Sequence, residues 1–547
     1  MRLIATLLLS LGVSAAAFGQ LPNNFWTPAP GTALPSAAQR QASPAAQQIF
    51  QADYAALVAA LATAPMEFTE SARQQPLLLT LPLADGQMAS FAVAESPVMA
   101  PELAAKFPAI RTYAGRATDG SGLTVRLGVG YNGFHAYMFS LDGHVQIVEP
   151  VAKKADNVYM AYRMEDLPEG THLDARCGAS ELAAPGNTLP RTVAPISAER
   201  ANTPVTLKTY RTAITAQAEY SLFHGGTVPL VMSEIVDAID FITAILERDF
   251  AVRLQLIPNN DILIYFDPAT DPFDGDLVTS WFNQNPQPTN QLIGVNNYDI
   301  GHVFTQVDPP GGVYVAGIAS LAGVCTQLDK ARAGSSLPDP TGTDFYLIVA
   351  HEMGHQFSAT HTFNSCPPAA DARTGSTAYE PGGGSTIMSY ATTCSPEIVG
   401  NRDGYYHIAS IEQARQFVTQ DEGSTCGTNT VTDNNYPSVS IPLTDGFYIP
   451  MSTPFALTAE ASDPDGDALT YCWEEYDLGL EGPLTDPVGT APLFRSFSPA
   501  ASPTRLFPRF LNLITNTSSV SEYLPDYSRK LTFKVTVRDN HPGAGGV

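Results

Sequence analysis

The stretch from Asp344 to Cys366 decides the fold of the central part of this chain, and it reads DFYLIVAHEMGHQFSATHTFNSC. On a helix with ~3.6 residues per turn, His351 and His355 lie one turn apart on one face, so their imidazoles can bind the same metal ion. Glu352 projects from the neighbouring face, where it can reach a water on that metal without being a ligand. His361 lies too far along the chain to share this face. The chain must therefore turn after the helix to bring His361 back as a third ligand.

A second element lies downstream, where residues 385–390 read STIMSY and contain Met388 and Tyr390. Three histidines and a glutamate in fixed register, followed by a methionine-containing turn, form the long zinc-binding motif. The combination resembles the metzincin clan of zinc endopeptidases. The His361 to Asn364 segment and the cysteine-bearing segments are most similar to secreted bacterial reprolysin-like (adamalysin-type) proteases, over roughly residues 201–430.

The resemblance implies roles for individual residues. His351, His355 and His361 would bind a catalytic Zn2+, and Glu352 would act as the general base. Met388 would form the floor of the site, because a flexible thioether fills the space below the imidazoles without adding charge. Tyr390 stands at the position where some metzincin families place a tyrosine that binds zinc or the transition-state oxyanion; a packed tyrosine is the alternative.

One position departs from the clan pattern, because residue 358 is glycine in the clan and serine here. The glycine takes a left-handed backbone conformation, which costs a residue with a Cβ roughly 1 to 2 kcal/mol. We therefore expect the zinc ligands to be retained and the turn at Ser358 to be strained or differently shaped.

Length and charge bound the possible roles of the whole chain. It has 547 residues and a formal net charge of -25. At ~100 to 200 residues per domain, the length suggests three or four units. The acidic balance argues against nucleic acid and anionic membrane surfaces as partners and favours an extracellular protein that can bind cations. After the N-terminus, no apolar run approaches the ~20 residues that span a bilayer.

The N-terminus predicts export. Residues 1–19 combine a positive Arg2, an almost wholly apolar or small run and a small-x-small cleavage site at Ala17-Phe18-Gly19. Six cysteines in an exported chain suggest disulfides. The reprolysin-like resemblance implies the pairs Cys325 with Cys426 and Cys366 with Cys394, which leaves Cys177 and Cys472.

Residues 20–202 resemble a β-rich, reprolysin-type propeptide, with strand-like runs at 124–129, 133–140 and 145–148. Its end, residues 183–203, is rich in Ala, Pro and Ser, a composition typical of an exposed linker that proteases can cut. Arg191 and Arg200 are the candidate processing sites.

Cys177 lies just before that linker, in the context Arg-Cys-Gly. Because a thiolate is a strong zinc ligand, a propeptide cysteine at the fourth coordination position would displace the catalytic water and keep the enzyme inactive. This context resembles the cysteine switch of related zymogens. The alternative is a cysteine of the β-rich prodomain that is either free or structural, and a structural cysteine could pair with Cys472.

Residues 203–430 predict an α+β catalytic domain with a mixed, twisted sheet and packed helices. We expect strands at 206–214, 251–257 and 261–266, and a long helix from Val228 to Phe250 with an apolar stripe at helical spacing. The metzincin resemblance implies that a small-residue strand within 311–324 forms the rim of the cleft, with Gly317 to Ser320 touching substrate; an ordinary buried strand is the alternative. His407 is expected at the start of the final helix, Ile408 to Thr419.

Residues 431–547 predict a separate β-sandwich module that resembles cadherin-like and polycystic-kidney-disease-like domains. Related architectures carry more C-terminal residues, so the module is expected to be incomplete. The loop SDPDGD places Asp463, Asp465 and Asp467 together, either as structural Ca2+ ligands or as plain turn residues.

These patterns predict a secreted zinc endopeptidase made as a zymogen, which acts on extracellular proteins and peptides. Pappalysin-like proteases share the three-histidine core and would change only the family. The alternative from a different class is a catalytically silent zinc-binding adhesion protein, in which the Asp-rich module is the functional part. An intact Glu352 argues against that alternative.

Overall fold

The structure is a computed structural model, and it describes residues 23–36, 40–152, 157–168, 175–178, 202–273, 278–307, 314–391, 393–394, 403–442, 446–484, 487–517 and 521–547. The predicted signal sequence, residues 1–19, lies outside these residues. So do Arg191 and Arg200 and most of the predicted linker. Among the helices within the described ranges, none is long and apolar enough to cross a membrane.

The N-terminal part forms one nine-stranded antiparallel sheet, in the order β1-β2-β9-β8-β7-β6-β5-β4-β3. Its strands are β1 (Trp26–Pro28), β2 (Gln48–Ala52), β3 (Leu77–Pro82), β4 (Met88–Glu95), β5 (Arg111–Ala117), β6 (Thr124–Gly130), β7 (Gly133–Phe139), β8 (Val145–Pro150) and β9 (Val158–Arg163). The helices are α1 (Tyr54–Leu61), α2 (Glu70–Gln74) and α3 (Pro101–Lys106). The three strand-like runs expected from the sequence are β6, β7 and β8, and they are central in this sheet.

The part that the sequence predicts to be catalytic is built on a seven-stranded mixed sheet, in the order β10-β14-β15-β13-β11-β12, with β16 also paired to β11. Its strands are β10 (Ala175–Cys177), β11 (Pro204–Ala216), β12 (Val252–Leu256), β13 (Ile300–Gln306), β14 (Tyr314–Ala319), β15 (Ala333–Leu337) and β16 (Thr428–Asn435). β14 runs antiparallel to β15, whereas β13 runs parallel to both β11 and β15. β16 spans the expected domain boundary after residue 430, so the catalytic sheet takes in residues that the sequence assigned to the next module.

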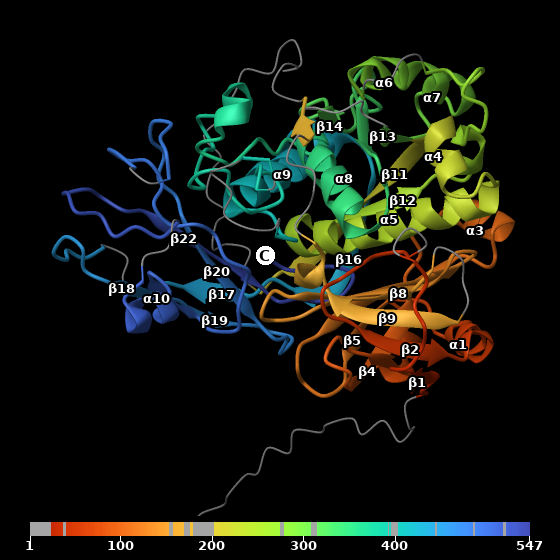
Figure 1. Ribbon diagram of the computed structural model, residues 1–547, viewed down its shortest axis with the longest axis horizontal. Coiled ribbons are helices and arrows are strands. Elements are labelled where there is room, and N and C mark those ends of the chain that lie inside the picture. Colours follow the sequence, from red (N-terminus) through yellow and green to blue (C-terminus); the bar gives the residue numbers. More distant parts are fainter. Residues whose placement is uncertain are drawn as a thin grey trace, which may run out of the picture.

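Within the described residues, the α-helices that accompany this sheet are α4 (Ala218–Phe223), α5 (Val228–Phe250), α6 (Val278–Gln284), α7 (Pro286–Leu292), α8 (Gly342–Gln356) and α9 (Ile408–Gln420). α5 has the bounds that its apolar stripe predicts. It lies between the catalytic sheet and the N-terminal sheet (Figure 1), and both of its sides contribute to one continuous apolar core. On the N-terminal side, the rings of Phe241 and Tyr137 of β7 have centroids 5.0 Å apart.

The prediction of a strand at 261–266 is wrong, because Asn260–Leu263 forms a short 3-10 turn instead. The Asn260 side chain pairs with the backbone of β11: Ile214 N donates to Asn260 Oδ1 at 2.8 Å, and Asn260 Nδ2 donates to Ile214 O at 3.0 Å. This amide satisfies the backbone groups of β11 that another strand would otherwise bond.

The described residues of the C-terminal module form three separate two-stranded antiparallel sheets, not the two packed sheets of the expected sandwich. The pairs are β17 (Ser438–Ser440) with β19 (Glu460–Ser462), β18 (Phe455–Thr458) with β21 (Thr504–Phe507), and β20 (Thr470–Glu475) with β22 (Phe533–Arg538). A short helix, α10 (Phe510–Thr515), follows β21. An aromatic core fills the module, in which Phe455 stacks on Phe507 at 4.8 Å.

Candidate metal centre

α8 carries the first two histidines and the glutamate, and all three side chains are buried. The Met turn packs directly below this helix at Gly354. A Cβ on Gly354 would lie 2.5 Å from the Met388 sulfur, so only glycine allows this approach. Met388 is therefore at the floor of the histidine cluster, where the resemblance places it.

The turn after α8 returns the chain at Ser358, whose φ is 76°. The serine thus takes the left-handed conformation that the clan's glycine takes. Ala359 follows, and its N–H donates to Gly354 O at 2.9 Å. The departure from the clan sequence leaves the shape of the turn intact and adds the cost of a Cβ at positive φ.

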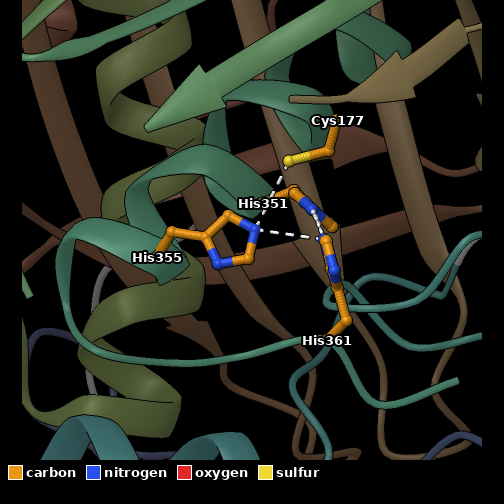
Figure 2. A group of neighbouring side chains, drawn as sticks. All are labelled: Cys177, His351, His355 and His361. Carbon is orange, nitrogen blue, oxygen red and sulfur yellow. Dashed lines mark hydrogen bonds between the residues drawn. The ribbon is translucent and has the colours of Figure 1, made fainter. Parts of the chain in front are cut away.

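The three histidines converge on one point, together with Cys177 (Figure 2). His361 Nε2 lies 3.2 Å from His351 Nε2 and 3.2 Å from His355 Nε2. The Cys177 sulfur lies 3.4 Å from His355 Nε2, and all four ligand atoms lie within 4.8 Å of one another. Among the described residues, this is the one group of three or more His, Cys, Asp or Glu side chains with that geometry.

Backbone carbonyls fix the orientation of each imidazole. His351 Nδ1–H donates to Ile387 O at 2.7 Å, and His355 Nδ1–H donates to Ala359 O at 2.8 Å. His361 Nδ1–H donates to Ala372 O at 2.7 Å. Each neutral ring then carries its lone pair on Nε2, and these lone pairs face one another. Such an arrangement is repulsive unless a cation lies between the nitrogens.

Burial keeps the rings in the neutral form that a metal requires. Desolvation lowers the pKa of His361 to about 4. Desolvation also holds the pKa of His355 well below its usual value, and the neighbouring His361 lowers it further. Neutral, preoriented imidazoles are the form in which histidine binds metals.

The donor set and its spacing fit zinc. Tetrahedral nitrogen ligands at ~2.05 Å from Zn2+ lie about 3.3 Å apart, and a thiolate at ~2.3 Å lies about 3.6 Å from such a nitrogen. The observed 3.2 and 3.4 Å separations match these values. Three histidines with one cysteine form a closed tetrahedral set, and the histidines alone form a set with one open position.

Cys177 reaches the site on β10, which adds to the edge of the sheet beside β14. Cys177 pairs with Gly317 in a parallel register, and Gly178 N donates to Gly317 O at 2.8 Å. The Cys177 sulfur also lies 3.4 Å from Glu352 Oε2. A Cβ on Gly317 would collide with the Glu352 carboxylate, which explains the small residue at this point of the rim strand.

No disulfide joins Cys177 to Cys472, since neither residue is disulfide-bonded. Cys472 is buried in the C-terminal module, where its thiol donates to Phe497 O at 3.3 Å. The structure contains the two disulfides that the resemblance implies, Cys325–Cys426 and Cys366–Cys394.

The Tyr390 hydroxyl bonds both backbone groups of Cys177. It donates to Cys177 O at 2.9 Å and accepts from Cys177 N at 3.1 Å. Its ring centroid lies 4.9 Å from that of His361. Burial, with the nearby Cys177 and Glu352, holds the pKa of Tyr390 well above its usual value, so the phenol remains a hydrogen-bond donor.

The other candidates are placed away from the metal centre. His407 caps α9, since its Nδ1 accepts from Ala409 N at 3.1 Å. Asp465 accepts from the Asn435 backbone at 2.7 Å, and Asp467 pairs with Arg116 at 2.5 Å. Asp463 accepts from the N–H groups of Asp465 and Asp467, which is ordinary turn chemistry. A calcium site at these three aspartates stays a prediction.

Two side chains that support the site have no signature in the sequence. Glu380 joins the Met turn to the segment after His361, because Thr362 Oγ1 donates to one carboxylate oxygen at 2.6 Å and Ser385 N to the other at 2.8 Å. Arg373 bonds the carbonyl of Asn364 at 2.8 Å. Both lie in a Pro- and Gly-rich loop without periodicity, and only the folded loop brings them to their partners.

The fold and the site together define a metallopeptidase domain: a mixed sheet, a histidine-bearing helix below its rim strand, and a Met turn under three converging imidazoles. A comparison with protein families agrees, since residues 206–415 match metallo-peptidase family M12B, reprolysin-like. This segment is a reprolysin-like metzincin domain. A search of curated proteins found no match for the chain.

Proposed function

We propose that the chain is a secreted zinc endopeptidase made as an inactive precursor, which hydrolyses peptide bonds in extracellular proteins. The observation that carries this proposal is the convergence of His351, His355 and His361 beside Glu352, with Cys177 at the remaining position. In this proposal residues 1–19 are a signal sequence, residues 20–202 are the propeptide, and a cut in the linker begins activation.

The chain's own residues divide the work of hydrolysis. Bound Zn2+ would supply Lewis acidity, which polarises the scissile carbonyl and lowers the pKa of water to about 7. Glu352 takes the proton of the attacking water and delivers it to the leaving amine. β14 aligns the substrate by main-chain hydrogen bonds along the edge that β10 occupies in the precursor. Tyr390 donates to the developing oxyanion, as it donates here to the Cys177 carbonyl.

Cys177 blocks these steps in the precursor. Its sulfur lies within 3.4 Å of both His355 Nε2 and Glu352 Oε2, the space that the attacking water needs. The backbone on either side is held by Tyr390 and Gly317. A thiolate in this position completes a closed zinc site, which has no open position for water.

The test compares casein cleavage and zinc content in the wild type, in Cys177→Ser, and in Cys177→Ser with Glu352→Ala added. We expect the intact wild type to hold one zinc and cleave little, and Cys177→Ser to cleave without processing. Glu352→Ala in the Cys177→Ser background should hold zinc and lose at least about 100-fold in activity, because the general base is gone. Removing zinc with a chelator should abolish cleavage by Cys177→Ser, and added zinc should restore it.

Each outcome separates a different part of the proposal. A Cys177→Ser protein that holds zinc but cleaves nothing would contradict the endopeptidase assignment and favour the silent zinc-binding protein. A wild type as active as Cys177→Ser would leave the endopeptidase in place and contradict the cysteine switch.

A further inference from the structure

The C-terminal module contacts the loop that follows the third histidine. We call residues 363–384 the ligand loop and residues 476–484 the module arm. Arg373 Nη2 donates to Gly479 O of the arm at 2.8 Å, and Asn364 Nδ2 donates to Leu480 O at 3.4 Å. The arm therefore holds the ligand loop at two points by direct hydrogen bonds.

Two packing contacts join the same segments. The rings of Tyr379 and Tyr476 stack with centroids 4.0 Å apart and planes inclined by 18°. The side chain of Leu484 fills the space beside Gly382, where a Cβ would lie 2.6 Å from Leu484 Cγ. Gly382 also has a φ of +58°, so the loop takes a conformation here that favours glycine. Packing against the module therefore determines the conformation of the ligand loop at these two points.

The ligand loop orients His361. Ala372 O, which accepts from His361 Nδ1 at 2.7 Å, belongs to the residue just before Arg373. Thr377 Oγ1 donates to the His361 carbonyl at 2.6 Å. Arg373 Nε also donates to Asn364 O at 2.8 Å, so one guanidinium ties the two ends of this segment to the module.

We propose that the C-terminal module positions the third zinc ligand of the catalytic domain, and that Arg373 is the positioning residue. This inference rests on the proposed zinc site. An acceptor on the second nitrogen of a zinc-bound histidine fixes the ring, and loss of such a partner typically weakens metal binding 10 to 100-fold. Without its bonds to the module, a loop with three consecutive glycines at 382–384 has many more backbone conformations available, and Ala372 O no longer stays in place.

The module has separate anchors that do not involve the ligand loop. Tyr476 Oη donates to Glu412 Oε2 of α9 at 2.6 Å, and Lys534 Nζ bonds the other oxygen of Glu412 at 2.5 Å. Glu474 accepts from Ile408 N at 2.9 Å. Loss of the Arg373 side chain therefore leaves the module attached, which makes the proposal testable by substitution.

The test measures zinc affinity of the full chain by competition with a chromophoric chelator, together with the thermal stability of the metal-free protein. We expect Arg373→Met to bind zinc 10 to 100-fold more weakly than the wild type. Arg373→Lys should lie between them, because an ammonium can bond one of the two carbonyls but lacks the fork of a guanidinium. The matched control is Arg211→Met, since Arg211 bonds Asp299 and contacts no residue of the ligand loop; its zinc affinity should equal that of the wild type.

A second variant addresses the module side. A Cβ on Gly479 would lie 2.5 Å from Ala491 Cα, so Gly479→Ala must displace the arm and with it the carbonyl that Arg373 bonds. We expect Gly479→Ala to weaken zinc binding, and the loss in the double variant to be smaller than the sum of the two single losses, because both changes break the bond between Arg373 and Gly479 O.

The proposal is overturned if Arg373→Met binds zinc within twofold of the wild type, or if it lowers the stability of the metal-free protein without changing zinc affinity. Additive losses in the double variant would also overturn it. A wild type that binds no zinc would instead contradict the proposed zinc site itself.

Discussion

Ser358 departs from the clan pattern but keeps the backbone conformation of the residue it replaces, with a φ of 76°. A Cβ in the left-handed region costs roughly 1 to 2 kcal/mol. Glycine avoids this cost, but it lowers stability by about 0.4 to 1 kcal/mol because it raises the entropy of the unfolded chain. Ser358→Gly should therefore raise the free energy of unfolding by up to about 1.5 kcal/mol. Denaturant unfolding of the zinc-free protein measures this change, and Ser358→Ala, which retains the Cβ, should show no gain.

If Ser358→Gly were as stable as Ser358→Ala, the left-handed turn would not be strained.

The sequence located this position because the clan pattern names it. It did not locate Glu380 or Arg373, because their roles come from contacts with Thr362, Ser385 and Gly479, which no local pattern reports. The ligands of a metal site are visible in a sequence as a motif, and the residues that orient them are visible only in the folded chain.

At the level of elements, α5 shows which features a periodic pattern can predict. Its stripe gives its bounds and its buried face, because apolar residues at helical spacing must pack against something. The pattern does not show that the opposite side is buried as well, against the N-terminal sheet. That side holds Asp237 and Asp240 at 5% and 2% exposure. From the sequence alone, two carboxylates on one helix indicate a solvent-exposed face. Only the partner sheet shows that they are buried.

These carboxylates give the protein a pH dependence. Burial raises the pKa values of Asp237 and Asp240 to about 7, although Arg126 opposes the shift at Asp240. Burial likewise raises the pKa of Glu149, on the facing sheet, to about 8, and lowers that of His135 to about 4. A raised carboxyl pKa means that the folded state holds more protons, so stability is lost as pH rises from about 4 through about 7.

His135 acts in the opposite direction mainly near and below its unfolded value of 6.5, since well above that value the ring is neutral in both states. Between pH 6.5 and 8.5 the carboxyls dominate, and the free energy of unfolding should fall by roughly 3 kcal/mol for this cluster. We expect Asp237→Asn to show a smaller loss of melting temperature across this range than the wild type. Asp85→Asn, in an exposed turn, should follow the wild type; equal slopes for all three proteins would contradict the assignment.

At the scale of the whole molecule, the N-terminal sheet and the catalytic domain are joined too closely to part when the linker is cut. One apolar core runs from Tyr137 and Ile147 of the sheet into both sides of α5. Arg126 of β6 bonds Asp240 at 3.0 Å and Glu247 at 3.3 Å, with all three side chains at most 4% exposed. Removing the sheet would expose this core and take the Arg126 cation from the buried Asp240, whereas Glu247 would keep its ion pair with Arg253.

We therefore predict that cutting the linker leaves a two-part complex. A specific protease sequence placed within residues 183–200 should give two fragments on a denaturing gel that elute together in size-exclusion chromatography under native conditions. Cys177 lies on the N-terminal side of this cut and pairs with β14, so the nicked protein should remain inactive until the cysteine is modified or removed.

Breaking a buried ion pair costs about 3 to 5 kcal/mol, and an exposed one costs at most about 1 kcal/mol. Arg126→Met should thus promote separation of the nicked fragments, whereas Arg116→Met, in which the half-exposed Arg116 side chain loses its bond to Asp467, should not. Fragments of the nicked wild type that separate in native buffer would show that the sheet is a removable inhibitor rather than a lasting part of the enzyme.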